Sequence, residues 1–367
     1  MVVDRFSSFN ELQRIQLRWV ELYQSDSTAN PFLSWDWVNA CLSAGSESWL
    51  ILGVRDGGPY LAFLPLRFGQ FPARGPALVR DLWLGLSPHA DFAGMLGVAD
   101  EESRFIPELA RTIRGLRWDR FRLHNCSDSR LDALLGEFRS GRYRTAIGES
   151  TPCPYVDLPQ TWDEYLSGRG KSTRRTIRAH LNKLESLPGY RLEFAPPDKA
   201  AAAIETLLRF HSIRWKKNLK AWRSMFGELF AQCYRAGCFA TCAMYQGEAV
   251  IAIQGFFINQ SRRTVVAYMI AHNPEYASYS PGVMLGCASI RRAIEEGFAR
   301  YDLSRGAQEY KMSLATGVAW ITNRTVCRRN PRVAVLRAGK AVVFCAKRVA
   351  HIFLAPRKKA RTPDPTS

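Results

Sequence analysis

The sequence has no run of about 18 uncharged apolar residues, the length that a membrane-spanning helix needs. Its first residues, MVVDRFSSFNELQRIQLRW, contain no apolar core of the signal-peptide type. The nine cysteines form no C-x-x-C pair and no ligand spacing with histidine, and an odd count without a disulfide framework indicates reduced thiols. These absences lead us to expect a cytoplasmic protein that holds no metal.

Acidic residues are also few, with 33 Asp and Glu against 51 Lys and Arg, which gives a net charge of +18. The excess is uneven, because residues 328–367 contain eleven Lys or Arg and one acid, Asp364, and so carry +10. The first 327 residues carry the remaining +8. A basic tail is a narrower feature than a basic protein, so charge alone does not predict nucleic-acid binding by the whole chain.

Hydrophobic residues make up 47% and aromatic residues 12% of the chain, which indicates a folded protein, and 367 residues suffice for two cores. Asp56-Gly57-Gly58 lies between two apolar stretches and is a hairpin signal. In the first half we predict helices at 10–23, 35–43 and 101–116 and strands at 49–54, 60–67, 78–84 and 120–124.

In the second half, three apolar stretches joined by short polar turns predict an antiparallel meander. We predict strands at 239–245, 249–258, 264–270, 299–303 and 319–327 and helices at 200–217, 281–296 and around 309–311. Because the two halves repeat one order of elements, we predict an α/β (α+β) fold of two similar units. Each unit is a mixed, mostly antiparallel sheet flanked by helices, residues 1–150 and 151–327, and a basic tail, 328–367, follows.

The helix that begins at Pro281 has the features of a phosphate site. Proline suits the first helical position, Ser280 before it can cap the helix, and Gly282 lets a ligand approach closely. The free amides of the first turn, from Gly282 to Leu285, point out of the helix end, where an anion can bind. The alternative is an ordinary strand-to-helix crossover with a good cap.

Four short segments resemble one protein family: FHSIRW at 210–215, SPG at 280–282, YDLSRG at 301–306 and EYK at 309–311. They are similar to GNAT acyltransferases of the CelD type, which are often associated with bacterial cellulose and exopolysaccharide synthesis and are related to Fem-type aminoacyl transferases. The resemblance covers roughly residues 30–325. A strict Gly-rich Q/R-x-x-G-x-G/A loop of that fold is absent.

The resemblance implies acyl transfer from acyl-CoA, acetyl-CoA in particular, to the nitrogen or oxygen of an amino sugar, polysaccharide or small-molecule acceptor. The family's central helix takes the CoA pyrophosphate on its N-terminal amides, and the edge of the preceding strand binds the thioester carbonyl. The donor-binding residues implied here are Ile270, Ala271, Ser280, Pro281, Gly282, Val283, Met284 and Leu285.

The same resemblance suggests catalytic groups. His211 lies in its motif, and a near-neutral intrinsic pKa suits removal of a proton from the acceptor. Tyr310 follows the fourth strand, where similar folds place the tyrosine that protonates the leaving thiolate. Asp302, Glu309 and Lys311 are candidates to orient the acceptor, or they form a surface salt-bridge cluster.

Basic residues offer further contacts to an anionic acceptor or to CoA phosphates. Arg174, Arg175 and Arg178 lie on a helix whose apolar stripe, with Ile177 and Leu181, faces another way, and Ser172 or Thr173 can cap it. The alternative is a solvated helix face. Trp215 shares a helix face with His211, and Arg305 either binds the acceptor or belongs to a turn. In the first half, His89 and Asp91 face the acceptor or lie in a polar loop.

Two other classes of protein remain open. A nucleic-acid binder would interleave aromatic and basic residues, and residues 169–183 do not. A catalytically inactive GNAT-fold accessory protein of polysaccharide synthesis is compatible with the sequence, as is a Fem-like enzyme that uses charged tRNA. The tail at 333–354 reads as a basic amphipathic helix. Residues 333–361 either contact the inner face of an anionic membrane or dock on the catalytic domain.

Overall fold

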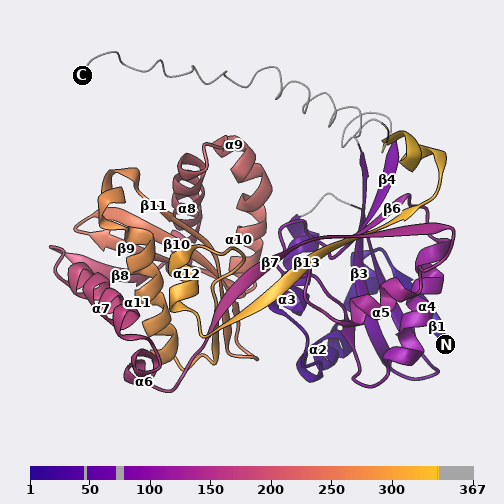
Figure 1. Cartoon of the computed structure of the whole chain (residues 1–367), viewed down its shortest axis with the longest axis horizontal. Coiled ribbons are helices and arrows are strands. Elements are labelled where there is room, and N and C mark those ends of the chain that lie inside the picture. The colour runs from indigo at the N-terminus through magenta and orange to yellow at the C-terminus, as the bar shows by residue number, and fades with distance from the viewer. Residues whose placement is uncertain (45–47, 72–77, 337, 339–367) are drawn as a thin grey trace, which may run out of the picture.

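The computed structural model describes residues 1–44, 48–71, 78–336 and 338 (Figure 1). Its strands form one 13-stranded sheet in the order β1-β2-β3-β4-β6-β13-β7-β12-β11-β10-β9-β8, with β5 beside β3. Figure 1 shows helices grouped around each end of this sheet, while β7 and β13 cross between the two groups. The predicted α/β fold with sheets flanked by helices is therefore confirmed.

The first half closely follows the predicted order. Gly57, with φ at +71°, forms the turn of the predicted hairpin. The predicted helix at 10–23 is two helices, since α1 ends before Arg14. The elements are β1 (Val2–Phe6), α1 (Phe9–Gln13), α2 (Gln16–Ser25), η1 (Pro31–Leu33), α3 (Trp35–Ala44), β2 (Trp49–Arg55), β3 (Tyr60–Phe71), β4 (Val79–Leu84), β5 (Leu96–Gly97), α4 (Glu102–Gly115), β6 (Arg120–Cys126) and α5 (Arg130–Gly136).

The second half repeats this arrangement after β7 (Tyr143–Asp157). The three strands β9, β10 and β11 are antiparallel, and β12 pairs with β11 in parallel, as β6 does with β4. The elements are α6 (Trp162–Ser167), α7 (Lys171–Glu185), β8 (Tyr190–Phe194), η2 (Pro197–Lys199), α8 (Ala200–Arg214), α9 (Leu219–Trp222), η3 (Arg223–Gly227), α10 (Glu228–Arg235), β9 (Phe239–Gln246), β10 (Ala249–Asn259), β11 (Thr264–His272), η4 (Pro274–Tyr279), α11 (Pro281–Glu295), β12 (Arg300–Asp302), α12 (Glu309–Leu314) and β13 (Gly317–Arg328).

The strands β7 and β13 join the halves into one sheet. β13 lies between β6 and β7, so the last strand of the chain completes the sheet of the first half. The boundary predicted at residue 150 falls inside β7. The sequence did not indicate β7, because residues 144–150 are exposed and show no alternation of apolar and polar side chains.

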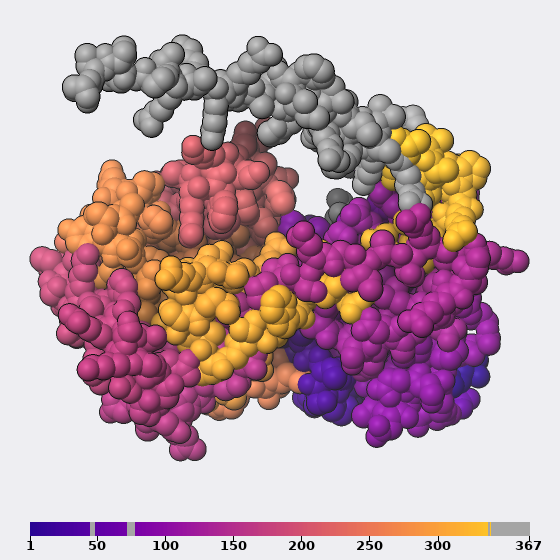
Figure 2. Space-filling view, viewed as in Figure 1, coloured from indigo at the N-terminus to yellow at the C-terminus, as the bar shows by residue number. Residues whose placement is uncertain are grey.

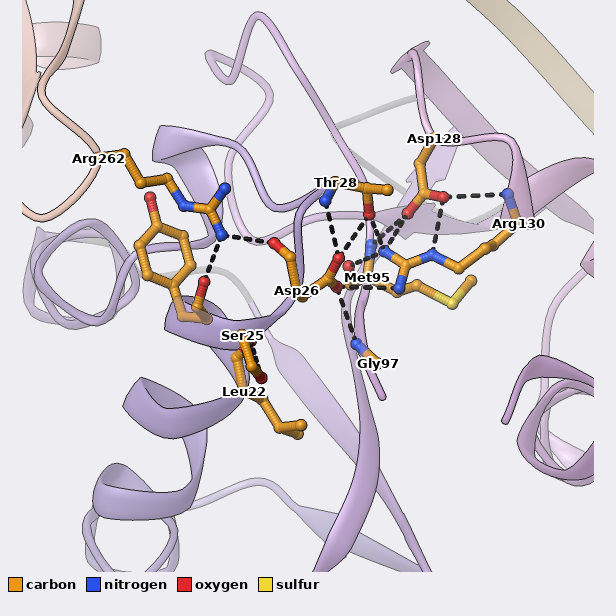
Figure 3. Close-up of polar contacts among 10 residues, drawn as sticks. Leu22, Ser25, Asp26, Thr28, Met95, Gly97, Asp128, Arg130 and Arg262 are labelled. Atoms are coloured by element: carbon orange, nitrogen blue, oxygen red, sulfur yellow. Dashed lines mark hydrogen bonds and ion pairs between the residues drawn. The ribbon is translucent and has the colours of Figure 1, made fainter. Parts of the chain in front are cut away.

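The halves also share packing and polar contacts. Phe32 of the first half packs edge-on against Phe257 of β10, with ring centroids 5.3 Å apart. The Arg262 guanidinium, from the turn between β10 and β11, donates to the backbone carbonyls of Tyr23 and Asp26 (Figure 3). Such contacts hold the two halves in one fixed relation, which matters because the cavity described below has walls from both.

Behind Asp26 lies a buried ionic network (Figure 3). The Arg130 guanidinium donates to Asp26 Oδ2 and to Asp128 Oδ2, each at 2.9 Å, and to the carbonyl of Met95. Asp26 Oδ2 also accepts the Gly97 N–H. Because every partner is charged or hydrogen-bonded, the buried charges are compensated, and the network joins α2, β5 and α5.

The packed chain extends beyond the expected end of the second half. Residues 331–336 are helical, Val333 and Leu336 are buried, and Asn330 Nδ2 donates to Asp119 Oδ1 at 2.8 Å. Most of the predicted helix at 333–354 and of the membrane-contact segment at 333–361 lies outside the described residues, so both stay predictions. Within the described part, no helix is long and apolar enough to cross a membrane.

Candidate active site

A cavity of about 410 Å³ lies beside the part of β11 that extends beyond its neighbouring strand, β12. Only Thr264, Val265 and Val266 of β11 pair with β12, which ends at Asp302, while β11 continues to His272. A bulge interrupts the pairing of β11 with β10 near Gly255. The open edge of β11 is covered by α8, α12 and a loop of the first half. The lining includes Asp91, His211, Arg214, Trp215, Lys217, Trp222, Phe226, Tyr268, Met269, Ile270, Ser304, Arg305, Gln308, Tyr310 and Lys311.

The backbone of Ile270 faces this open edge. The Asn273 N–H donates to the carbonyl of Ile251 on β10 at 3.0 Å, which fixes the side that residue 273 faces. Since neighbouring strand residues direct their backbone groups to opposite sides, Ala271 faces β10 and Ile270 faces away from it. Arg214 Nη1 donates to the Ile270 carbonyl at 3.4 Å, in agreement. The expectation that the Ala271 N–H binds the thioester carbonyl is therefore wrong, because the backbone groups of Ala271 belong to the ladder with β10.

The N-terminus of α11 lies beside Ile270. Ser280 has a left-handed backbone, with φ at 55°, and its side chain makes no capping bond, so the predicted side-chain cap is wrong. Its carbonyl instead accepts the N–H groups of Val283 and Met284, at 3.0 and 3.3 Å. Among the described residues, the Gly282 N–H finds no partner. A Cβ at Gly282 would lie 3.9 Å from Ile270 Cδ1, so the helix end adjoins the cavity.

His211 lies in the cavity wall but lacks the expected near-neutral pKa. Burial lowers its pKa to about 4, and the Arg214 charge adds to this effect. Its Nε2 accepts the Trp215 Nε1–H at 3.1 Å, and its buried Nδ1 finds no partner in the described part of the chain. The imidazole is therefore neutral at pH 7, and its accepting nitrogen is already engaged. It is poorly suited to act as the general base.

Two carboxyl groups with raised pKa values, those of Asp302 and Asp91, lie near the end of β12. Burial raises the pKa of Asp302 to about 7, and the Ser304 N–H donates to its Oδ1 at 2.7 Å. Burial also raises the pKa of Asp91, whose Oδ2 accepts the Ser304 hydroxyl at 2.6 Å and whose Oδ1 lies 3.3 Å from Arg305 Nε. Asp91 comes from the first half and lines the cavity, so its interpretation as a contact to the acceptor stays open, whereas Asp302 does not line the cavity.

Helix α12 supplies the opposite side. Tyr310 lines the cavity, burial raises the pKa of its phenol, and no described residue bonds to its hydroxyl. Lys311 Nζ donates to the Arg305 carbonyl at 3.0 Å, and burial lowers the pKa of its ammonium group. Helix α12 follows β12 after a short loop, and both of these side chains line the cavity beside β11.

Several predicted site residues lie elsewhere. Glu309 is exposed and does not line the cavity. The helix α7, with Arg174, Arg175 and Arg178, packs on α11 outside the cavity, and its N-cap is Gly170, so neither Ser172 nor Thr173 caps it. The His89 carbonyl accepts a hydrogen bond from the Tyr268 hydroxyl, and the His89 ring packs on Phe226. His89 therefore contributes to packing and not to binding of the acyl acceptor.

The structure adds cavity residues that the sequence did not single out, notably Arg214, Lys217, Trp222, Tyr268 and Ser304. Two of them had a signal. Arg214 lies inside the FHSIRW segment, and Ser304 lies inside YDLSRG. No local sequence signal marked Trp222 or Tyr268. They line the same cavity only because the tertiary fold brings α9 and β11 together there. Among the described residues, no group of His, Cys, Asp and Glu could hold a metal ion.

The chain is similar to a known domain family and to several solved structures. Residues 171–312 match the family model described as an acetyltransferase (GNAT) domain. A search of curated proteins gave no match. Among solved structures, FemX superposes with a TM-score of 0.61 at 9% identity, over 91% of this chain and 99% of that chain.

Two further structures are similar over the full length. A tandem GNAT protein from the clavulanic acid biosynthesis pathway gives a TM-score of 0.52 at 11% identity, over 90% of this chain and 99% of that chain. The C-terminal domain of a putative lysylphosphatidylglycerol synthetase from Agrobacterium fabrum gives 0.53 at 10%, over 90% and 96%. The chain thus has a tandem GNAT fold, and the cavity borders its second half, where the acetyltransferase domain model matches.

Proposed function

We propose that the protein is an acyl-CoA-dependent acyltransferase that moves an acetyl group to the amine or hydroxyl of an amino sugar, polysaccharide or small-molecule acceptor. One observation carries the proposal: among the described residues, the outer backbone edge at Ile270, the unpartnered Gly282 amide beside it and the unbonded Tyr310 hydroxyl lie in or next to one cavity. Transfer from acyl-CoA needs a donor to the thioester carbonyl, a site for the CoA pyrophosphate and an acid for the leaving thiolate.

The residues have distinct roles in this proposal. The Ile270 N–H donates to the thioester oxygen as negative charge develops there, and Gly282 with its helix end takes the pyrophosphate. Asp91 accepts the proton of the attacking acceptor, since its carboxyl lines the cavity and burial raises its pKa above the usual range of an aspartate. Tyr310 gives a proton to the departing thiolate. The CelD-like setting in exopolysaccharide synthesis remains part of the proposal.

The pH dependence distinguishes Asp91 from His211. A base must be deprotonated, so activity should rise with pH through the raised pKa of Asp91, above the usual range of an aspartate. In Asp91→Asn this rise in kcat/KM should disappear, whereas His211→Ala should keep it, because the pKa of His211 is about 4. Loss of the rise in His211→Ala alone would return the role of base to the histidine.

Native mass spectrometry of the purified protein with a panel of acyl-CoAs tests the function itself. We expect one acyl-CoA per chain, with a free thiol and an acylated acceptor after incubation. An inactive accessory protein would show neither binding nor transfer. Fem-like aminoacyl transfer, favoured by the fold similarity to FemX, would instead show no CoA adduct and a product only with charged tRNA.

A further inference from the structure

The charges of the cavity indicate the chemical class of the acceptor. We propose that the acceptor carries a carboxylate or phosphate group of its own, which Arg214 and Lys217 bind. The inference rests on the proposed acyl transfer for the reaction that follows. The anion binding that it describes is measurable without turnover.

Four basic side chains line the cavity: Arg214, Lys217, Arg305 and Lys311. The one acid in the lining, Asp91, is already bonded to the Ser304 hydroxyl and lies against Arg305. In the described part of the chain, no carboxylate lies within 4.0 Å of a charged nitrogen of Arg214, Lys217 or Lys311. Asp91 offsets Arg305, and Asp91 and Asp302 both act on Lys311, so among the described residues Arg214 and Lys217 are the cavity cations without a carboxylate partner.

This positive charge acts on its neighbours. Burial lowers the pKa of His211, and Arg214 lowers it further. Burial raises the pKa of Tyr310, and Arg214 opposes that rise. Arg214 is the last residue of α8 and Lys217 follows in the loop before α9, both with exposed side chains, and Arg214 donates to the Ile270 carbonyl. An anion held at these two cations would place the rest of the acceptor beside the thioester position.

The same charge excludes other acceptors. A polyamine, or an amino sugar without an anionic group, brings an ammonium into a site that already repels cations. An acceptor with its own anion is attracted, and the basic groups lower the pKa of its ammonium, which favours the nucleophilic neutral amine. Trp215, with 51% of its surface exposed, offers an indole face for a sugar ring or a planar group beside the charges.

The phosphates of CoA are the other anions that these cations could bind. The helix end at Gly282, where the pyrophosphate is proposed to bind, does not line the cavity and adjoins it only through Ile270. In this proposal Arg214, which lines the cavity and donates to the Ile270 carbonyl, lies on the acceptor side of Ile270. Separate affinities for donor and acceptor distinguish the two sources.

The test compares the full chain with the double variant Arg214→Gln/Lys217→Gln. Calorimetry measures binding of glucosamine, glucosamine 6-phosphate, muramic acid and acetyl-CoA. We expect at least one anionic sugar to bind about tenfold more tightly than glucosamine, and more weakly as salt rises. The double variant should lose this preference and keep its affinity for acetyl-CoA. Arg139→Gln, at an exposed arginine outside the cavity lining, should behave as the wild type.

The outcomes separate cleanly. Comparable affinities of the wild type for neutral and anionic sugars overturn the inference. Weaker acetyl-CoA binding in the double variant, with the sugar preference intact, assigns the cations to donor phosphates and also overturns it. No acetyl-CoA binding by the wild type, together with a retained anion preference, refutes acyl transfer while the anion site stands. The tighter of the two anionic sugars tells phosphate from carboxylate.

Discussion

Gly282→Asp is expected to abolish binding of acetyl-CoA. The Gly282 N–H is the unpartnered amide at the start of α11, and a carboxylate there would face the pyrophosphate. Two unit charges about 4 Å apart repel by about 4 kcal/mol at an effective dielectric of 20. This repulsion corresponds to a loss of acetyl-CoA affinity of more than about 100-fold. Isothermal calorimetry with acetyl-CoA measures the effect.

The matched control is Gly282→Ala. A Cβ at this position meets only Ile270 Cδ1, at 3.9 Å, an ordinary contact. Alanine adds size without charge, so affinity should fall only a few-fold. An aspartate in the first turn stabilises a helix by about 0.3–1 kcal/mol, so the melting temperature of Gly282→Asp should not drop. Unchanged CoA affinity in the folded aspartate variant would remove the pyrophosphate from this helix end.

Tyr310→Phe should slow the transfer step by about 10²- to 10⁴-fold, the usual contribution of one general acid. Burial raises the pKa of this phenol, so Tyr310 carries its proton at neutral pH and can give it to the leaving thiolate. Its hydroxyl bonds to no described residue, so the substitution breaks no hydrogen bond of the fold. The dissociation constant of acetyl-CoA should stay the same while kcat falls.

Met312→Leu serves as the control on the same helix, because Met312 is 41% exposed and does not line the cavity. It should keep the wild-type kcat. Single-turnover measurements should show that the chemical step, rather than product release, is slowed in Tyr310→Phe. A wild-type single-turnover rate in that variant would leave the tyrosine as a wall of the cavity only.

Local features of the sequence predicted much of the fold. The turn at Asp56-Gly57-Gly58 and the polar links between β9, β10 and β11 specify hairpins by their residue types, and apolar runs between them specify strands. Tyr310 and Lys311 were predicted as site residues from the resemblance of their segment to a known family, and both line the cavity.

Residues far apart in the sequence escaped prediction. Asp91 meets Ser304, a residue 213 positions later, and the exposed, weakly patterned β7 forms its ladder with β13. The pKa of His211 also depends on its burial and on the charge of Arg214. A sequence lists the ionisable groups but not the surfaces that desolvate them.

The sequence by itself determined the order of elements, the repeat of one unit and the placement of motif residues beside β12 and α11, since turns, caps and apolar periodicity act over a few residues. Only the tertiary structure decided which backbone edge stays open, because β12 ends at Asp302 and pairs only with residues 264–266 of β11, so Ile270 lies beyond that pairing. It also decided that a loop of the first half closes the cavity and that uncompensated cations gather there, because charge and burial depend on contacts between distant segments.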